Sequence, residues 1–291
     1  MTALTDLMLS ENLLEGTLPR DLGNLTNLTY LGFAYNKFTG TIPTSIGSLT
    51  QLRTLKGDYN QLQGTIPPTI GNMTGLLYLV LSYNQLQGAV PSEIGSLSNL
   101  FDLELHNNYL DTLPREISRL QQLTSLSVGF NSFCGPIPST IGDMTSLVGL
   151  FLENNRFNGS IPANLALLPN LKQLELDHNE LSGTVPHSLN GMDSLETLHL
   201  NDNRLTGALW SGFGGNMTRN MVSLFLQNNL IGGDVPPTFE TWACGFGKNG
   251  SGVVGRQCQL EGNVFTKEVV ARNPCSARWC ALGGGGRRVE V

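Results

Sequence analysis

Residues 76–95 read LLYLVLSYNQLQGAVPSEIG, and this stretch contains both halves of a repeating unit. In the first half, Leu76, Leu79 and Leu81 follow the pattern L-x-x-L-x-L-x-x-N, which ends at Asn84. The alternation around Leu79 and Leu81 predicts a short strand with its leucines on one side. One such strand cannot bury its apolar side alone, so units of this kind must stack and share a core.

The same pattern recurs along most of the chain. Its matches begin at Leu4, Leu28, Leu52, Leu76, Leu100, Leu123, Leu147, Leu171, Leu195 and Met221, spaced by 23, 24 or 26 residues. Its Asn recurs as Asn12, Asn36, Asn60, Asn84, Asn108, Asn131, Asn155, Asn179, Asn203 and Asn229. Ten near-regular matches predict stacked repeats whose strands form a parallel sheet, each followed by a returning segment. The stacked Asn side chains are expected to satisfy buried backbone groups at the turns.

The returning half of the unit is also repeated. Gly88, Pro91 and Gly95 correspond to Gly40, Pro43 and Gly47, to Gly64, Pro67 and Gly71, and to Gly135, Pro138 and Gly142. Glycine permits a turn, and proline fixes an extended return. This L-x-G-x-I-P-x-x-I-G-x-L-x-x-L pattern resembles the plant-type leucine-rich repeat family over about residues 1–240. The resemblance implies an α/β fold, a right-handed solenoid of about ten repeats with a parallel β-sheet on its concave face.

Three repeats depart from the pattern. Gly57 stands where an inward-facing Leu is expected, which predicts a thin spot in the core. The fifth repeat, around Leu110–Pro114, is one residue short and lacks the Gly, so its return should be tighter. In the ninth repeat, residues 208–215 stand where the other repeats have the segment that contains proline.

Composition divides the chain in two. Of 49 Leu, 47 lie in residues 1–230, which predicts a solenoid over residues 1–240 and a Cys-containing cap and flexible tail over 241–291. Residues 1–240 carry 10 basic and 20 acidic side chains, a net charge of −10, which argues against a nucleic-acid partner. No apolar stretch is long enough for a membrane span, and residues 1–30 lack the features of a signal peptide.

Four cysteines cluster after the last repeat. Disulfides between Cys244, Cys258, Cys275 and Cys280 are favoured over a zinc site, because the cysteines lack the close pairs typical of zinc ligands; three pairings are open. Cys134 is then expected to be free. Disulfides imply an oxidising compartment, which favours a truncated sequence or an excised part of a surface protein. Candidate glycosylation sites agree with secretion: Asn24, Asn27, Asn72, Asn158, Asn216 and Asn249.

The sequence does not point to catalysis. G-x-G-x-x-G occurs at residues 245–250 and 250–255, but no helical run follows it, as a dinucleotide loop requires. Metalloprotease, Walker, nucleophile-elbow and kinase motifs are also missing. The sequence therefore predicts a protein that is not an enzyme and has no cofactor.

The outward-facing side chains of the predicted sheet are where a ligand could be recognised. The aromatic candidates are Tyr30, Tyr35, Tyr59, Tyr78, Tyr83 and Phe130, of which the tyrosines lie in the N-terminal half. The C-terminal half is acidic, with Glu104, Glu153, Glu175, Asp177 and Asp202. Exposed aromatic clusters mark interfaces. The alternative is a lateral ladder that only stabilises neighbouring strands.

Two histidines are predicted to pair across neighbouring repeats. Glu175 and His199 share one column of the sheet, and His178 and Asp202 share another, at about 4.8 Å between strands. Solvated ion pairs are the ordinary interpretation, and a metal cluster or pH switch is the alternative.

The features together favour a non-catalytic recognition module that binds a protein, peptide or glycan on its concave face. Residues proposed to bind the partner are Tyr30, Tyr35, Tyr59, Tyr78, Tyr83, Phe130, Glu153, Glu175 and Asp177. The resemblance implies part of an extracellular receptor-like surface protein. A secreted inhibitor of a cell-wall enzyme and an intracellular scaffold are the alternatives.

Overall fold

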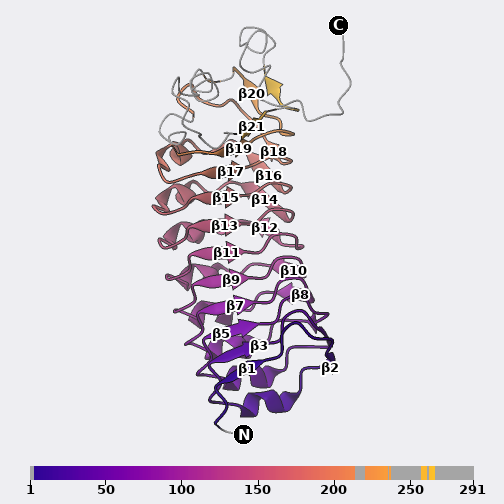
Figure 1. Cartoon of the computed structure of the whole chain (residues 1–291). Coiled ribbons are helices and arrows are strands. Elements are labelled where there is room, and N and C mark those ends of the chain that lie inside the picture. Colours follow the sequence, from indigo (N-terminus) through magenta and orange to yellow (C-terminus); the bar gives the residue numbers. More distant parts are fainter. Residues whose placement is uncertain (1–2, 214–219, 235, 237–256, 261, 266–291) are drawn as a thin grey trace, which may run out of the picture.

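The computed structural model describes residues 3–213, 220–234, 236, 257–260 and 262–265. In this part of the chain, eleven short strands form one parallel sheet whose spatial order is the chain order, as Figure 1 shows. The strands are β1 (Asp6–Met8), β3 (Tyr30–Gly32), β5 (Thr54–Lys56), β7 (Tyr78–Val80), β9 (Asp102–Glu104), β11 (Ser125–Ser127), β13 (Gly149–Phe151), β15 (Gln173–Glu175), β17 (Thr197–His199), β19 (Ser223–Phe225) and β21 (Gln257–Gln259). The predicted leucine-rich repeat solenoid is confirmed.

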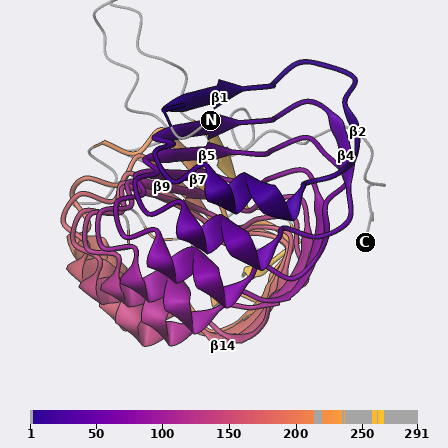
Figure 2. The ribbon, with the colours of Figure 1, turned by 90° about the horizontal axis from the view of Figure 1, so that it is seen from below.

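The returning segments contain 3-10 helices of five residues. They are η1 (Arg20–Asn24), η2 (Thr44–Ser48), η3 (Pro68–Asn72), η4 (Ser92–Ser96), η5 (Arg115–Arg119), η6 (Ser139–Asp143), η7 (Ala163–Leu167) and η8 (His187–Gly191). Each begins directly after a proline with an extended backbone, for example Pro91 at φ −65° and ψ 142°. Seen along the stack, the helices lie on the side opposite β1, β5 and β7 (Figure 2).

A second set of strands, which the sequence does not predict, lies between the large sheet and the helices. They are β2 (Glu15–Thr17), β4 (Lys37–Thr39), β6 (Gln63–Gly64), β8 (Gln85–Ala89), β10 (Tyr109–Thr112), β12 (Cys134–Pro136), β14 (Arg156–Ser160), β16 (Glu180–Gly183), β18 (Arg204–Leu205), β20 (Gly232–Gly233) and β22 (Val264–Phe265). They pair in parallel as β2-β4, β6-β8-β10, β12-β14-β16-β18 and β20-β22. Between Leu110 and Thr112, in the shortened fifth repeat, the register shifts, and β10 does not pair with β12.

The core is a stack of leucines closed at one corner by the motif asparagines. Leu76, Leu79 and Leu81 are fully buried, as expected. The amide nitrogen of Asn84 donates to the carbonyls of Gly57 (2.9 Å), Leu81 and Ser82 (3.2 Å each). Its oxygen accepts the N–H of Leu62 at 3.0 Å. The predicted asparagine ladder is therefore confirmed.

The predicted thin spot at Gly57 is wrong. A Cβ added there would lie 2.4 Å from the Phe33 ring and 3.3 Å from Leu81. Phe33 stands one repeat earlier, at the same position of the motif, and its ring fills the space that a leucine at Gly57 would occupy. The core is thus full where the sequence pattern suggests a gap.

At the C-terminal end, β21 extends the large sheet and places Cys258 opposite Leu224. Cys244, Cys275 and Cys280 lie outside the described residues, so the disulfides and the boundary near residue 240 stay predictions. Cys134 is an exposed free cysteine. Of the glycosylation candidates, Asn24, Asn27, Asn72 and Asn158 are exposed, whereas Asn216 and Asn249 lie outside the described residues. Across the described ranges, the helices are too short and too polar to traverse a lipid bilayer.

Candidate ligand-binding face

The candidate site is the side of the large sheet that points away from the core, which we call the sheet face. Within β7, Leu79 points inward, so its neighbours Tyr78 and Val80 point outward. The register places Tyr78 beside Thr54 of β5 and beside Asp102 of β9. Equivalent side chains of successive repeats therefore form columns along the stack.

One column has a left-handed backbone in every described repeat. The residue before each motif Asn has φ between 51° and 59°: Glu11, Tyr35, Tyr59, Tyr83, Asn107, Phe130, Asn154, His178, Asp202 and Asn228. Asn and Asp tolerate this conformation, whereas bulky side chains rarely adopt it. Its four aromatic residues are thus held at a backbone cost of about 1 kcal/mol each, which marks them as candidates for a role other than folding.

Three of these aromatic side chains form a stack. The rings of Tyr35 and Tyr59 lie 4.4 Å apart at 13°, and those of Tyr59 and Tyr83 lie 4.1 Å apart at 12°. Each ring remains 39–51% exposed. A hydrogen bond to the Tyr83 side chain, with burial as a smaller cause, raises the pKa of Tyr59 to about 12. We call these three residues the tyrosine stack.

The other predicted aromatic residues stand apart from the stack. Tyr30 and Tyr78 share a different column with Thr54 between them. Tyr78 is 42% exposed, and the ring of Tyr30 lies over Gly32, within 2.8 Å of where a Cβ would stand. Phe130 is exposed in the left-handed column but is separated from Tyr83 by Asn107.

The predicted acidic half carries carboxylates that are only partly solvated. Burial, reinforced by Asp102, raises the pKa of Glu104 to about 7. Burial, with smaller contributions from Glu175 and Asp177, raises the pKa of Glu153 to about 7. Burial followed by the charge of Asp177 also raises the pKa of Glu175. A cation placed on this half of the sheet face would relieve both the repulsion and the poor solvation.

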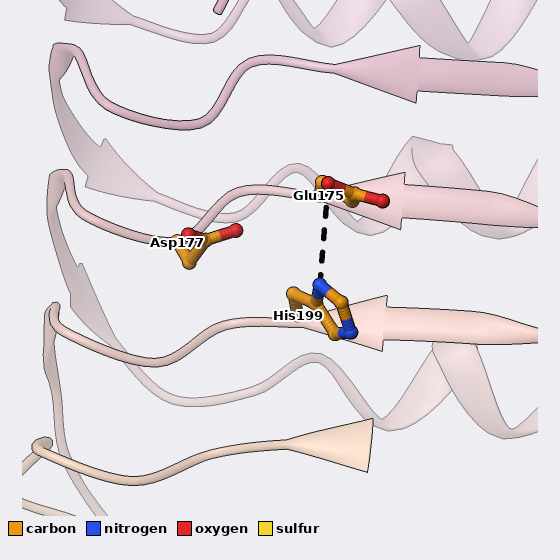
Figure 3. A group of neighbouring side chains, drawn as sticks. All are labelled: Glu175, Asp177 and His199. Atoms are coloured by element: carbon orange, nitrogen blue, oxygen red, sulfur yellow. Dashed lines mark ion pairs between the residues drawn. The ribbon is translucent and has the colours of Figure 1, made fainter. Parts of the chain in front are cut away.

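Both predicted histidine pairs are present. His199 Nδ1 lies 4.0 Å from Glu175 Oε2, and His178 Nε2 lies 3.4 Å from Asp202 Oδ2. His178 also contacts Asp177, at 2.8 Å from its Nδ1 to Oδ2. Glu175, Asp177 and His199 project from neighbouring repeats toward one another (Figure 3).

A line of buried oxygen atoms, which is not evident from the sequence, lies beside these residues. In the described part of the chain, no hydrogen-bond partner is present for Glu153 Oε2, Asp177 Oδ1, Asn201 Oδ1 or Gln227 Oε1. The four residues occupy the same column in four successive repeats. Their repeat spacing was readable from the sequence, but their burial depends on neighbours across the sheet. Buried polar atoms are ordinarily hydrogen-bonded, so this line has spare capacity for a donor or a cation.

Comparisons with known proteins agree with this architecture. The profile described as "Leucine-rich repeat region" matches residues 78–228, and the profile described as "Leucine Rich Repeat" matches residues 3–25 and 27–49. Comparison with curated proteins gave no match.

Several solved structures share the fold. The ectodomain of the Arabidopsis thaliana membrane receptor kinase GASSHO1/SCHENGEN3, in complex with CASPARIAN STRIP INTEGRITY FACTOR 2, matches with a TM-score of 0.83 and 34% identity over 91% of this chain and 31% of that chain. The Arabidopsis receptor kinase HAESA, in complex with the peptide hormone IDA and the co-receptor SERK1, matches with a TM-score of 0.76 and 32% identity over 91% of this chain and 47% of that chain. A plant ice-binding protein matches with a TM-score of 0.67 and 26% identity, over 80% of this chain and 74% of that chain. This chain therefore spans less than half the length of the two receptor chains.

Proposed function

Because the chain belongs to the plant-type leucine-rich repeat family, we propose that it is a non-catalytic recognition module that binds a peptide or protein ligand on its sheet face. We further propose that it forms part of a receptor-like protein on the outside of the cell. Two of the similar receptor ectodomains are described in complex with a peptide hormone or a named protein factor. The exposed glycosylation candidates support the extracellular assignment.

The observation that carries the proposal is the tyrosine stack. Tyr35, Tyr59 and Tyr83 keep large exposed surfaces in a backbone conformation that disfavours tyrosine. Stacked rings are rigid, so little side-chain entropy is lost when a ligand covers them. An apolar segment or a sugar ring of the ligand is therefore proposed to lie on the tyrosine stack.

The acidic half of the sheet face supplies the second recognition element. Glu153, Glu175 and Asp177 are crowded and partly buried, so a Lys or Arg side chain of the ligand would be attracted there. Phe130, one repeat before Glu153, offers an exposed ring between the tyrosine stack and Glu153. The preferred ligand is thus an extended chain with an apolar segment and a basic segment.

The test is a binding screen with synthetic peptides that vary in apolar and basic content, with neutral oligosaccharides as a separate arm. The triple substitution Tyr35→Ala, Tyr59→Ala and Tyr83→Ala should weaken binding of the best ligand at least about 30-fold, because even one interface anchor typically contributes about 2 kcal/mol. Tyr109→Ala is the matched control, since Tyr109 is 62% exposed but lies in β10, outside the large sheet. Loss of binding in the control and retention in the triple variant would overturn the site assignment.

A further inference from the structure

We propose that Glu175, Asp177 and His199 bind a divalent transition-metal ion of the zinc type on the sheet face. The ion and a basic side chain of the ligand would be alternative occupants of Glu175 and Asp177. Each residue offers one ligand atom, and the three atoms lie within 4.8 Å of one another. Figure 3 shows the imidazole of His199 directed at Glu175, with Asp177 beside them. In a tetrahedral zinc site, two ligand atoms that each lie about 2.1 Å from the ion are about 3.4 Å apart, so the two carboxylates would have to rotate toward His199 to complete the site.

The His199 ring is already oriented for ligation. Its Nε2 is 2.7 Å from Ser223 Oγ, and its ring stacks on Phe225 at 4.3 Å and 7°. Nδ1 is left facing Glu175 at 4.0 Å. A histidine that binds a metal through one nitrogen is usually held by a hydrogen bond at the other.

Asn201 is an independent indication that something is bound here. It follows His199 by two residues, stands beside Asp177 in the neighbouring repeat, and is only 5% exposed. Its Nδ2 donates to Asp202 Oδ2 at 2.8 Å, but its Oδ1 has no partner in the described part of the chain. Asp177 Oδ1 and Glu153 Oε2 are also buried and unpartnered. Leaving such oxygens unsatisfied is costly, and a cation would satisfy several of them at once.

Among the residues that the structure describes, no Lys or Arg side chain forms an ion pair with this group. Within the described ranges, the Lys and Arg ion pairs on this part of the chain are Lys172–Glu196 and Arg204–Glu180, neither of which includes Glu153, Glu175 or Asp177. His178 contacts only the other oxygen of Asp177. One imidazole nitrogen with carboxylate oxygens suits Zn²⁺, Co²⁺ or Mn²⁺ better than Mg²⁺ or Ca²⁺, which prefer oxygen ligands alone.

The test titrates the metal-free full chain with Co²⁺ and Mn²⁺ in separate experiments. Binding of one equivalent is expected, with a weak visible Co²⁺ spectrum typical of nitrogen and oxygen ligands. An intense near-ultraviolet thiolate band would place the ion on the cysteines and would count against the proposal. In the wild-type chain, Mn²⁺ should broaden the imidazole NMR signals of His199 before those of His106 and His187. Equal broadening of the three would also contradict it.

Variants supply the second arm of the test. His199→Gln and Glu175→Gln should each weaken binding at least about tenfold, and Ser223→Ala should weaken it by a similar factor through loss of ring orientation. His187→Gln and Glu104→Gln are matched controls, since His187 stacks on Trp210 and Glu104 lies three repeats before Glu175. Unchanged affinity in all three site variants, with their fold verified by circular dichroism, would refute the site.

Discussion

At the scale of single residues, the left-handed backbone before each motif Asn separates side chains that suit the turn from side chains that do not. The left-handed column contains Asn107, Asn154 and Asn228, which suit its backbone, and also Phe130, which does not. The sequence shows the mixture of Asn and aromatic residues but not its cause, because φ is set by the turn. A residue that is poor for the turn is the best indicator of a surface role.

Replacing Phe130 by Asn should therefore stabilise the protein. Phe130 has φ 53° and is 48% exposed, so little packing is lost while the backbone strain is relieved. The expected gain is about 0.5–1 kcal/mol in the free energy of unfolding, measured by urea denaturation. Phe130→Ala, which lacks the ring but does not favour the left-handed backbone, is the control and should be less stable than the Asn variant. Equal stabilities of the two variants would mean that the strain is negligible.

At the scale of the repeat, core side chains pack against residues of the neighbouring repeats. The sequence of one repeat therefore does not define how its core is filled. The motif leucine and asparagine positions could be predicted from the period, because most repeats place the same residue at the same point. Two features could not be predicted from the sequence: the second set of strands, and the packing of the Phe33 ring into the space that a leucine at Gly57 would fill. The second strands lie in the returning half of the repeat, where glycine and proline indicated a turn and an extended return and not a paired strand. The packing of Phe33 over Gly57 couples residues in two different repeats.

Restoring the leucine pattern at Gly57 should destabilise the protein. A side chain added to Gly57 collides with the Phe33 ring, so Gly57→Leu is expected to cost about 1–3 kcal/mol, read from the thermal midpoint. The double variant Phe33→Leu with Gly57→Leu should recover most of the loss, because two leucines then share the space of one ring. If the effects of the two substitutions are additive in a double-mutant cycle, Phe33 does not fill the space at Gly57.

At the scale of the whole molecule, folding brings carboxylates of the sheet face close together and partly buries them, which disfavours their charged forms. The sequence predicted the acidic residues but not their pKa values, since burial depends on the assembled sheet. Glu104 faces Asp102 on its own strand and Asp58 and Lys56 two repeats earlier, and its pKa is raised to about 7. Burial is the largest cause, and Lys56 opposes it only weakly.

This raised pKa predicts that stability falls as pH rises from about 4.5 to about 7. In that window the folded state keeps a proton on Glu104 that the unfolded state has released, so raising the pH favours unfolding. The carboxyl group is only half-buried, and solvent screening reduces the effect to about 1 kcal/mol. Urea midpoints at pH 5 and pH 8 should differ less in Glu104→Gln than in the wild type. Glu93→Gln, in η4, is the control. Because Glu153 also has a pKa raised to about 7, part of the pH dependence should remain in Glu104→Gln, and an undiminished pH dependence would contradict this origin.

The missing pairing between β10 and β12 has a mechanical consequence. Tension applied to the ends of the stack is carried by the repeats in series, so the weakest junction yields first. The second set of strands is also interrupted between β4 and β6 and between β18 and β20, but isolated bridges, Thr41–Gln63 and Ala208–Gly232, cross those two breaks. Between β10 and β12 the described residues form no such bridge, and the Ser132 N–H donates to the Leu110 carbonyl at 2.8 Å without a following ladder. Under tension, the stack would then separate near residues 110–132 into two shorter solenoid segments. Each freed repeat of about 24 residues would lengthen the chain by about 80 Å.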